Sequence, residues 1–243
     1  MRIANQIEML ELDLGIMVVH PVIVFDETGW VLIDTGMPGS AQTLFDQAKQ
    51  AGVAERLLTA VLLTHQDLDH IGGLPGIVAS SDTPPVIWAH PADEGAINGT
   101  EPFQKISREQ LFGMLQSLPD NEARVQFEQA YPESGLKHVH RTFTHGDKLP
   151  FGGGLTVIHT PGHTPGHVSF YHHASKTLIA GDAMVANDGV LEGPNPQMTP
   201  DLDQALDSLK ALIDYDIEQV VCYHGGLIQG GVNERIAKLA DRS

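Results

Sequence analysis

A dense group of side chains able to bind metal ions occupies residues 64–73, which read THQDLDHIGG and follow the apolar run 60–63. Four such side chains fall within six positions: His65, Asp67, Asp69 and His70. Alternation along a strand would place the first three on one side, and a turn into a helix would bring the fourth to join them. No packing requirement explains this cluster, so the segment predicts a site for two metal ions.

The net charge restricts the partners of the chain. It has 243 residues and a formal net charge of −17 at pH 7. Non-specific binding to nucleic acid depends on Lys and Arg side chains that neutralise phosphates, and an anionic membrane surface repels an acidic protein in the same way. We therefore expect a small-molecule substrate, and neither nucleic acid nor a membrane as a partner. The sequence leaves the oligomeric state open.

Cysteine content and hydropathy bear on location. The single cysteine, Cys222, rules out an internal disulfide, which is compatible with a reducing compartment. The apolar stretch 14–25 has no basic region before it and is too short to span a bilayer, so we interpret it as a strand. We expect a cytoplasmic protein.

Strand and helix patterns alternate along the chain. Turn residues 26–29 separate two β-rich runs and predict a hairpin. Further strands are predicted at 60–63, 86–89, 155–159, 167–171, 177–180 and 219–223, and helices at 40–50, from 71, 201–214 and 232–240. We predict an α/β fold, an αββα sandwich of two mixed β-sheets with helices on the outer faces, formed by one domain over residues 1–243. Residues 92–135 have a helical pattern and form a lid-like insertion.

Three later segments each end a predicted strand with a side chain that can bind a metal ion. A turn rich in proline and glycine follows residues 155–160 and would present His163. The run 178–182 ends at Asp182, and the run 220–224 ends at His224. Each of these signals is weak alone, but together with residues 64–73 they form an ordered set.

These motifs, in this order, resemble those of the metallo-β-lactamase superfamily. The chain has THxDxDH at 64–70, TPGHTPGH at 160–167, GD at 181–182, the late His224, and Asp34 in LIDTG. The resemblance extends from about residue 16 to 226 and implies the αββα fold, with two metal ions at one edge between the sheets. It implies that His65, Asp67 and His163 bind the first ion, that Asp69, His70 and His224 bind the second, and that Asp182 bridges both.

Asp67 departs from the family signature HxHxDH, which has a second histidine at that position. An additional carboxylate makes the site less electrophilic and shifts its preference from zinc toward manganese or iron. We expect two divalent ions, with zinc favoured and manganese or iron as alternatives. In having an acidic residue at this position, the chain also resembles the flavodiiron proteins of the superfamily, whose metal ions are iron.

Other side chains are expected to support the site. Asp69 is a candidate catalytic residue that would orient the attacking water, and Tyr223 is a second candidate that would assist an oxyanion or point away. Asp34 is expected to hydrogen-bond the loop that carries the ligands. His167 either hydrogen-bonds a ligand or simply begins a strand.

The favoured hypothesis is a hydrolase in which a hydroxide bridging two metal ions attacks a lactone, an ester or a related carbonyl. Such ions lower the pKa of bound water to roughly 7, so a nucleophile exists at neutral pH. The alternatives are an iron-dependent oxidoreductase of the flavodiiron type and a phosphodiesterase or thioesterase of the same fold. A non-catalytic metal-binding protein is disfavoured, because all seven ligand positions hold competent side chains.

Overall fold

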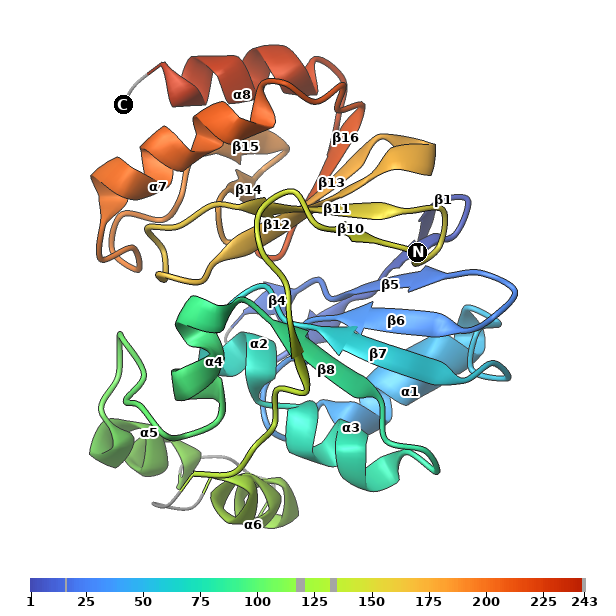
Figure 1. The fold of residues 1–243 in the computed structure, drawn as a ribbon, viewed down its shortest axis with the longest axis vertical. Helices are drawn as coiled ribbons and strands as arrows, with labels where there is room; N and C mark the ends of the chain where they lie inside the picture. The colour runs from blue at the N-terminus through green and yellow to red at the C-terminus, as the bar shows by residue number, and fades with distance from the viewer. Residues whose placement is uncertain (16, 117–120, 132–134, 242–243) are drawn as a thin grey trace.

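Two β-sheets lie at the centre of the molecule, with helices on both outer faces (Figure 1). The computed structural model describes residues 1–15, 17–116, 121–131 and 135–241. The predicted αββα sandwich is confirmed by this arrangement. The two termini belong to different layers, because the chain begins in the first sheet and ends in the helical layer beyond the second.

The first sheet comes mainly from the N-terminal half. It has seven strands in the order β1-β2-β5-β6-β7-β8-β9, antiparallel from β1 to β6 and parallel from β6 to β9. Its strands are Arg2–Ala4, Ile7–Met9, Val22–Phe25, Trp30–Ile33, Leu58–Leu62, Val86–Ala89 and Arg141–Thr142. The predicted hairpin is the pair β5 and β6. A small separate sheet pairs β3 (Leu12–Asp13) with β4 (Val18–Val19).

The second sheet comes from the C-terminal half. It has six strands in the order β10-β11-β12-β13-β16-β17, and only β13 and β16 pair in parallel. Its strands are Lys148–Leu149, Leu155–His159, Val168–His172, Thr177–Gly181, Gln219–Cys222 and Gly226–Gln229. A second small sheet pairs β14 (Val185–Asn187) with β15 (Val190–Glu192). Both main sheets are therefore mixed, as predicted.

Helices form the outer layers. Those on the side of the first sheet are α1 (Ala41–Gln50), α2 (Leu68–Ile71), α3 (Leu74–Ser80), α4 (Pro91–Ile97), α5 (Arg108–Leu115) and α6 (Asn121–Ala130). Those on the side of the second sheet are α7 (Leu202–Ser208), the 3-10 helix η2 (Leu209–Leu212) and α8 (Val232–Ala240). A further 3-10 turn, η1 (His173–Ser175), lies between β12 and β13.

Three apolar clusters hold these layers together. One joins the two sheets, with Val31 and Leu62 of the first sheet and Val157 and Phe170 of the second among its members. The other two clusters lie between each sheet and its helices. Burial of apolar surface on both faces explains why strands such as Val22–Phe25 are apolar at every position instead of alternating.

The predicted insertion is only partly helical. Residues 98–107, between α4 and α5, have no regular secondary structure, and residues 117–120 and 132–134 lie outside the described part of the chain. Leu111, Phe127 and Tyr131 are buried in the cluster beneath the helices of the first sheet. Most of the insertion thus extends the helical layer, and covering of a substrate by it stays a prediction.

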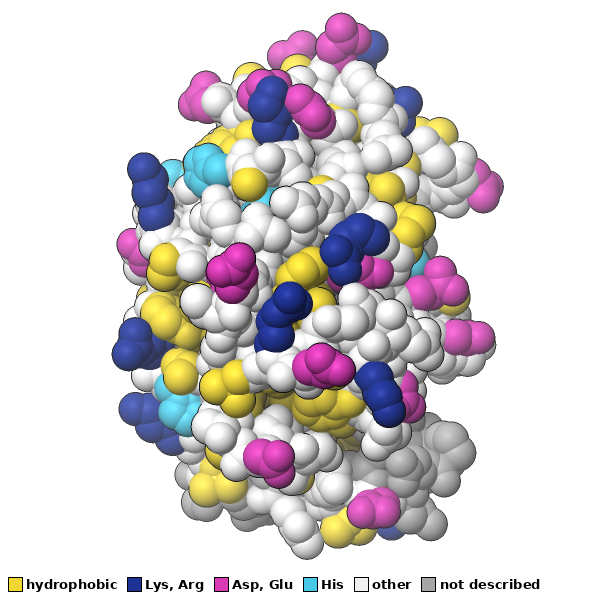
Figure 2. Space-filling model, turned by 90° about the vertical axis from the view of Figure 1, so that its right-hand side faces the viewer, with side chains coloured by type: hydrophobic (Ala, Val, Ile, Leu, Met, Phe, Trp, Pro, Cys, Tyr) yellow, Lys and Arg dark blue, Asp and Glu magenta, His cyan; other side chains and the backbone are white. Residues whose placement is uncertain are grey.

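Charges of both signs are mixed on the face shown in Figure 2, where Lys and Arg side chains lie among Asp and Glu side chains. Within the described residues, no helix has the length and apolar character required to cross a membrane.

Candidate metal centre

The ligands at 65–70 come from a loop and a short helix. Strand β7 ends at Leu62, a loop follows, and Asp67 with its extended backbone is the N-cap of α2. Asp69 and His70 lie in the single turn of that helix. The prediction that strand alternation would align these side chains is wrong, because no strand extends past Leu62. The side chains still converge, since the loop and the helical turn face the same edge of the sheet.

The other three predicted ligands follow strands of the second sheet. His163 lies in the turn between β11 and β12, Asp182 comes directly after β13, and His224 comes two residues after β16. Gly181 has a φ of +55°, and a Cβ at this position would lie 2.8 Å from Nε2 of His167. Glycine therefore allows the backbone to turn sharply over that imidazole just before Asp182.

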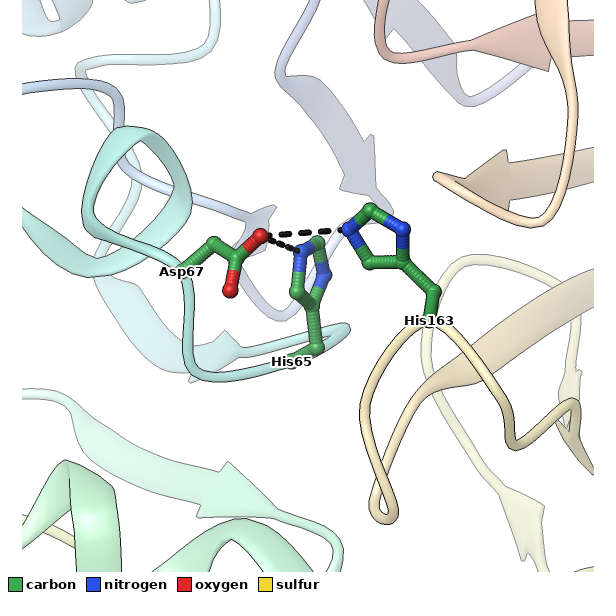
Figure 3. A group of neighbouring side chains, drawn as sticks. All are labelled: His65, Asp67 and His163. Carbon is green, nitrogen blue, oxygen red and sulfur yellow. Dashed lines mark hydrogen bonds and ion pairs between the residues drawn. The ribbon is translucent and has the colours of Figure 1, made fainter. Parts of the chain in front are cut away.

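His65, Asp67 and His163 form one compact group (Figure 3). Nε2 of His65 lies 3.3 Å from Oδ2 of Asp67, and Nε2 of His163 lies 3.1 Å from the same oxygen. The two halves of the chain thus meet here, since the carboxylate and one imidazole come from the loop after β7 and the other imidazole comes from the turn before β12. These three are the residues predicted for the first ion.

Asp69, His70 and His224 form a second group, as predicted for the second ion. Oδ2 of Asp69 is 3.7 Å from Nε2 of His70 and 3.3 Å from Nε2 of His224. Asp182 lies between the groups: its Oδ1 is 3.3 Å from His70, and its Oδ2 is 3.3 Å from both His163 and His224. Asp182 therefore contacts side chains of both groups.

Unpaired buried atoms show that the residues fit a cation. Nε2 of His65, Nε2 of His70 and Oδ1 of Asp182 are buried, and apart from the ion-pair contacts given above they make no hydrogen bond of good geometry among the described residues. A buried polar atom without a partner costs about 1–3 kcal/mol. These three atoms point into one site, and each can donate a lone pair to a metal ion. They match the imidazole and carboxylate ligands that bind zinc, manganese or iron.

Hydrogen bonds on the far side of the rings orient the imidazoles. Nδ1 of His70 lies 2.9 Å from Oδ2 of Asp34, and Nδ1 of His163 lies 3.2 Å from Oγ1 of Thr199. Nδ1 of His65 lies 3.0 Å from Oγ1 of Thr64. With Nδ1 engaged, each Nε2 is left to face the site, which is the usual arrangement behind metal-binding histidines.

Asp34 and His167 both hydrogen-bond residues of the site, which is the role expected for Asp34 and one of the two expected for His167. Asp34 is buried and accepts hydrogen bonds from the backbone N–H of Thr64, at 2.8 Å, and from its hydroxyl, at 2.7 Å. His167 is fully buried, and its Nε2 accepts a hydrogen bond from the backbone N–H of Asp182 at 2.9 Å. Of the two interpretations of His167, the structure therefore favours hydrogen bonding at the site. Burial lowers its pKa well below the usual value, so it is a neutral acceptor.

The mutual charges of the site shift its pKa values. Burial disfavours the charged forms, but the carboxylates of Asp182, Asp34 and Asp69 outweigh it and raise the pKa of His70 well above its usual value. Asp182 and Asp69 similarly raise the pKa of His224 to about 10 against the effect of burial. In turn, the pKa of Asp182 is well below its usual value, because the charges of His70 and His224 outweigh burial. The carboxylates of the site therefore stabilise positive charge placed between them.

Tyr223 packs beneath the second group. Its ring centroid lies 3.8 Å from that of His70, and its hydroxyl donates a short hydrogen bond to the backbone carbonyl of Asp69. The side chain is almost fully buried. These contacts position the turn of α2, and they fit that role better than the catalytic one, which stays a prediction.

Two side chains in contact with the site were not identified from the sequence. Asp93 of α4 is fully buried and hydrogen-bonds both ligand-bearing loops, through Gln66 on one side and Thr164 and Gly166 on the other. Lys105, between α4 and α5, reaches Asp67 and His163. Neither residue belongs to a recognisable motif, and only the folded chain brings them to the ligands.

The two stacked mixed sheets and the seven converging His and Asp side chains define a protein of the metallo-β-lactamase class. The chain belongs to the metallo-beta-lactamase superfamily, whose family model matches residues 15–224.

Individual relatives agree with this assignment. The chain is 30% identical to the probable metallo-hydrolase YflN of Bacillus subtilis over 231 residues, which cover 88% of this chain and 82% of the relative. A metallo-beta-lactamase family protein from Thermus thermophilus shares the fold, with a TM-score of 0.69 and 21% identity over 99% of this chain and 80% of its own. TTHA1623 in a di-iron-bound form has a TM-score of 0.64 and 27% identity, covering 93% of this chain and 98% of its own.

Proposed function

We propose that the chain is a dinuclear metal-dependent hydrolase that acts on the carbonyl of a small-molecule lactone, ester or related substrate. One observation carries this proposal: the buried atoms Nε2 of His65, Nε2 of His70 and Oδ1 of Asp182 have no hydrogen-bond partner among the described residues, and these three residues form a group that joins the two described above. His65, Asp67 and His163 would hold one ion, Asp69, His70 and His224 the other, and Asp182 would be shared. The probable metallo-hydrolase YflN, which is similar over most of the chain, supports the same class of reaction.

The bound ions would acidify a water molecule to provide the nucleophile and would polarise the carbonyl oxygen of the substrate. We propose zinc as the resident metal, with manganese or iron as alternatives. The mixed imidazole and carboxylate ligands suit all three metals. The di-iron-bound form of TTHA1623 supports iron as an alternative at such a site.

Asp69 is the residue that we propose to move a proton. Its pKa is lowered because the charge of His70 and the hydrogen bond from His224 outweigh burial, so its carboxylate is ionised at neutral pH. About a fifth of its side chain is exposed, so the residue lies at the edge of the site that solvent reaches. As the water adds to the carbonyl carbon, Asp69 would accept its proton and deliver it to the leaving oxygen when the carbon–oxygen bond breaks.

Metal analysis together with a substrate screen tests the proposal. The purified chain is expected to bind two divalent ions and to hydrolyse at least one class among lactones, esters, thioesters and phosphodiesters. Asp182→Asn should reduce both the number of bound ions and the turnover. Asp203→Asn, an exposed carboxylate on α7, is the matched control and should change neither.

The iron-dependent oxidoreductase is the second candidate, and Asp67 is the observation that favours it. A carboxylate in the first group makes that position harder and more suited to iron. Tightly bound iron with turnover of oxygen or peroxide and without hydrolysis would overturn the hydrolase proposal and support this one. Hydrolysis of a thioester or phosphodiester alone would retain the dinuclear hydrolase and change only its substrate.

A further inference from the structure

Lys105 places an ammonium group inside the first group of ligands. Its Nζ lies 2.5 Å from Oδ2 of Asp67 and 2.5 Å from Nε2 of His163. Only about an eighth of the Lys105 side chain is exposed. This is a buried contact between a cation and two of the three side chains of the group, made by a residue far from both in sequence.

The ammonium uses the lone pairs that a metal ion would need. A lysine ammonium has three donors and no acceptor, so at Nε2 of His163 it can only bind the lone pair of that nitrogen. Nδ1 of the same ring is engaged with Thr199, which leaves Nε2 as the ligand atom. The carboxylate oxygen of Asp67 is shared in the same way. An ammonium in this position and a metal ion bound by the same atoms exclude each other.

The backbone near Lys105 is anchored to the ligand loop. The N–H of Gln104 donates a hydrogen bond to Oε1 of Gln66 at 2.9 Å, and Gln66 is held in turn by Asp93. The flexible four-carbon stem of lysine can swing the ammonium in and out while the backbone stays in place. Because the backbone is anchored, the ammonium of Lys105 stays close to the first group even when it is not in contact with the ligands.

The second group has no such competitor. Asp69 forms ion pairs with His70 and His224, and among the described residues no lysine or arginine reaches it. The positive charge of Lys105 is thus directed at the position where Asp67 replaces the histidine of the family signature. The negative charge that Asp67 adds to the first group is thus offset by the positive charge of Lys105.

We propose that Lys105 is a tethered cation that competes with the metal ion of the first group, so that the two positions fill in order, the second before the first. This inference rests on the proposed dinuclear site. It assigns a role in metal loading to a residue of the insertion, separate from any contact with substrate. Without a metal ion, the ammonium of Lys105 neutralises the carboxylate of Asp67. When a metal ion binds the first group, the ammonium must move away from these ligand atoms.

Metal titration of Lys105→Met tests the order of loading. The full-length chain is stripped with a chelator and titrated with Zn²⁺ and separately with Mn²⁺, in competition with a chromophoric chelator. We expect two unequal steps in the unsubstituted chain. Since a hydrogen bond to a charged group is lost on displacement, the weaker step should tighten in the variant by about tenfold to a hundredfold. Lys210→Met, which removes an exposed ammonium paired with Asp207, should leave both steps unchanged.

Thermal stability separates this role from a merely structural one. With the chelator present, Lys105→Met should lower the thermal midpoint, because the buried carboxylate of Asp67 loses its counter-charge. With saturating metal, the variant should be at least as stable as the unsubstituted chain. Loss of stability in both conditions would assign Lys105 a structural role and overturn the inference.

The possible failures are distinguishable. If both proteins bind two ions with equal affinities, the competition is overturned and the dinuclear site stands. If Lys105→Met binds metal more weakly, lysine assists the site and the inference is again overturned. If neither protein binds metal, the proposed function and this inference both fail.

Discussion

Asp93→Asn offers the most direct test of how the two ligand-bearing loops are held together. Each carboxylate oxygen of Asp93 accepts two hydrogen bonds. Oδ1 accepts from Nε2 of Gln66, at 3.0 Å, and from the N–H of Gly166, at 2.8 Å; Oδ2 accepts from the N–H of Gln66, at 3.0 Å, and from the hydroxyl of Thr164, at 2.7 Å. The residue is fully buried, so no solvent replaces a lost partner.

The magnitude follows from the shape of the amide. Asparagine has the same size but only one acceptor oxygen, so in either orientation two of the four donors face an NH2 group. The hydroxyl of Thr164 can turn to accept from this NH2 group, so one or two donors are left unpaired depending on the orientation of the amide. At about 1–3 kcal/mol for each of them, the free energy of unfolding should fall by about 1–6 kcal/mol. At least one backbone N–H, that of Gln66 or that of Gly166, loses its partner whichever way the amide turns.

Urea unfolding in the presence of a chelator measures this loss without a contribution from metal binding. Asp147→Asn is the matched control, because Asp147 is exposed and accepts a hydrogen bond from the N–H of Thr144 in a surface turn. The control should change the free energy of unfolding by less than about 1 kcal/mol. A loss below about 1 kcal/mol in Asp93→Asn would refute the reasoning that this carboxylate joins the loops.

Three further predictions concern the metal centre. Asp67→His should preserve the fold and raise zinc occupancy relative to manganese or iron in a competition measured by metal analysis; an unchanged preference would contradict the argument from ligand hardness. The pKa of His224 is raised to about 10, so in chelator-treated protein its charged form stabilises the fold. This contribution is fully present below the unfolded pKa near 6.5 and is lost as the pH rises toward 10, so the thermal midpoint should fall over that range. A midpoint that rises would contradict the assigned charge. Tyr223→Phe should cost about 0.5–1.5 kcal/mol of unfolding free energy, because the carbonyl of Asp69 loses a donor, while kcat changes by less than about threefold. A loss of kcat beyond about a hundredfold would instead support the catalytic role predicted for Tyr223.

The fold and the convergence of the seven candidate ligands could be predicted because both depend on local signals. Apolar runs identify the central strands, and the ligands stand at the ends of those runs, as Asp182 does after β13. The fold also agrees with the expectation that the chain is built from two β-rich halves with helices outside them. Short edge strands such as β9 and β14 were not predicted, since two or three residues carry too little pattern to be distinguished from a loop.

The side chains that hold the site together could not be predicted, for a physical reason. Asp93 lies in the first turn of a helix, where acidic residues are common at the surface, and its burial arises only when the turn at 160–167 packs on it. Lys105 is an isolated lysine in an irregular segment. Contacts across 38 and 58 positions of sequence place it at Asp67 and His163, and no local pattern encodes such contacts.

The division of the ligands between the two sheets has a consequence for the order of folding. Most strand pairs form between neighbours in sequence within one half, whereas His163 and Asp67 are 96 positions apart. Loop closure over that distance is slow relative to local pairing, so the halves should acquire their sheets before they dock. The complete set of metal ligands would then exist only after the halves dock. Metal binding would therefore come late in folding, and it would mainly slow unfolding.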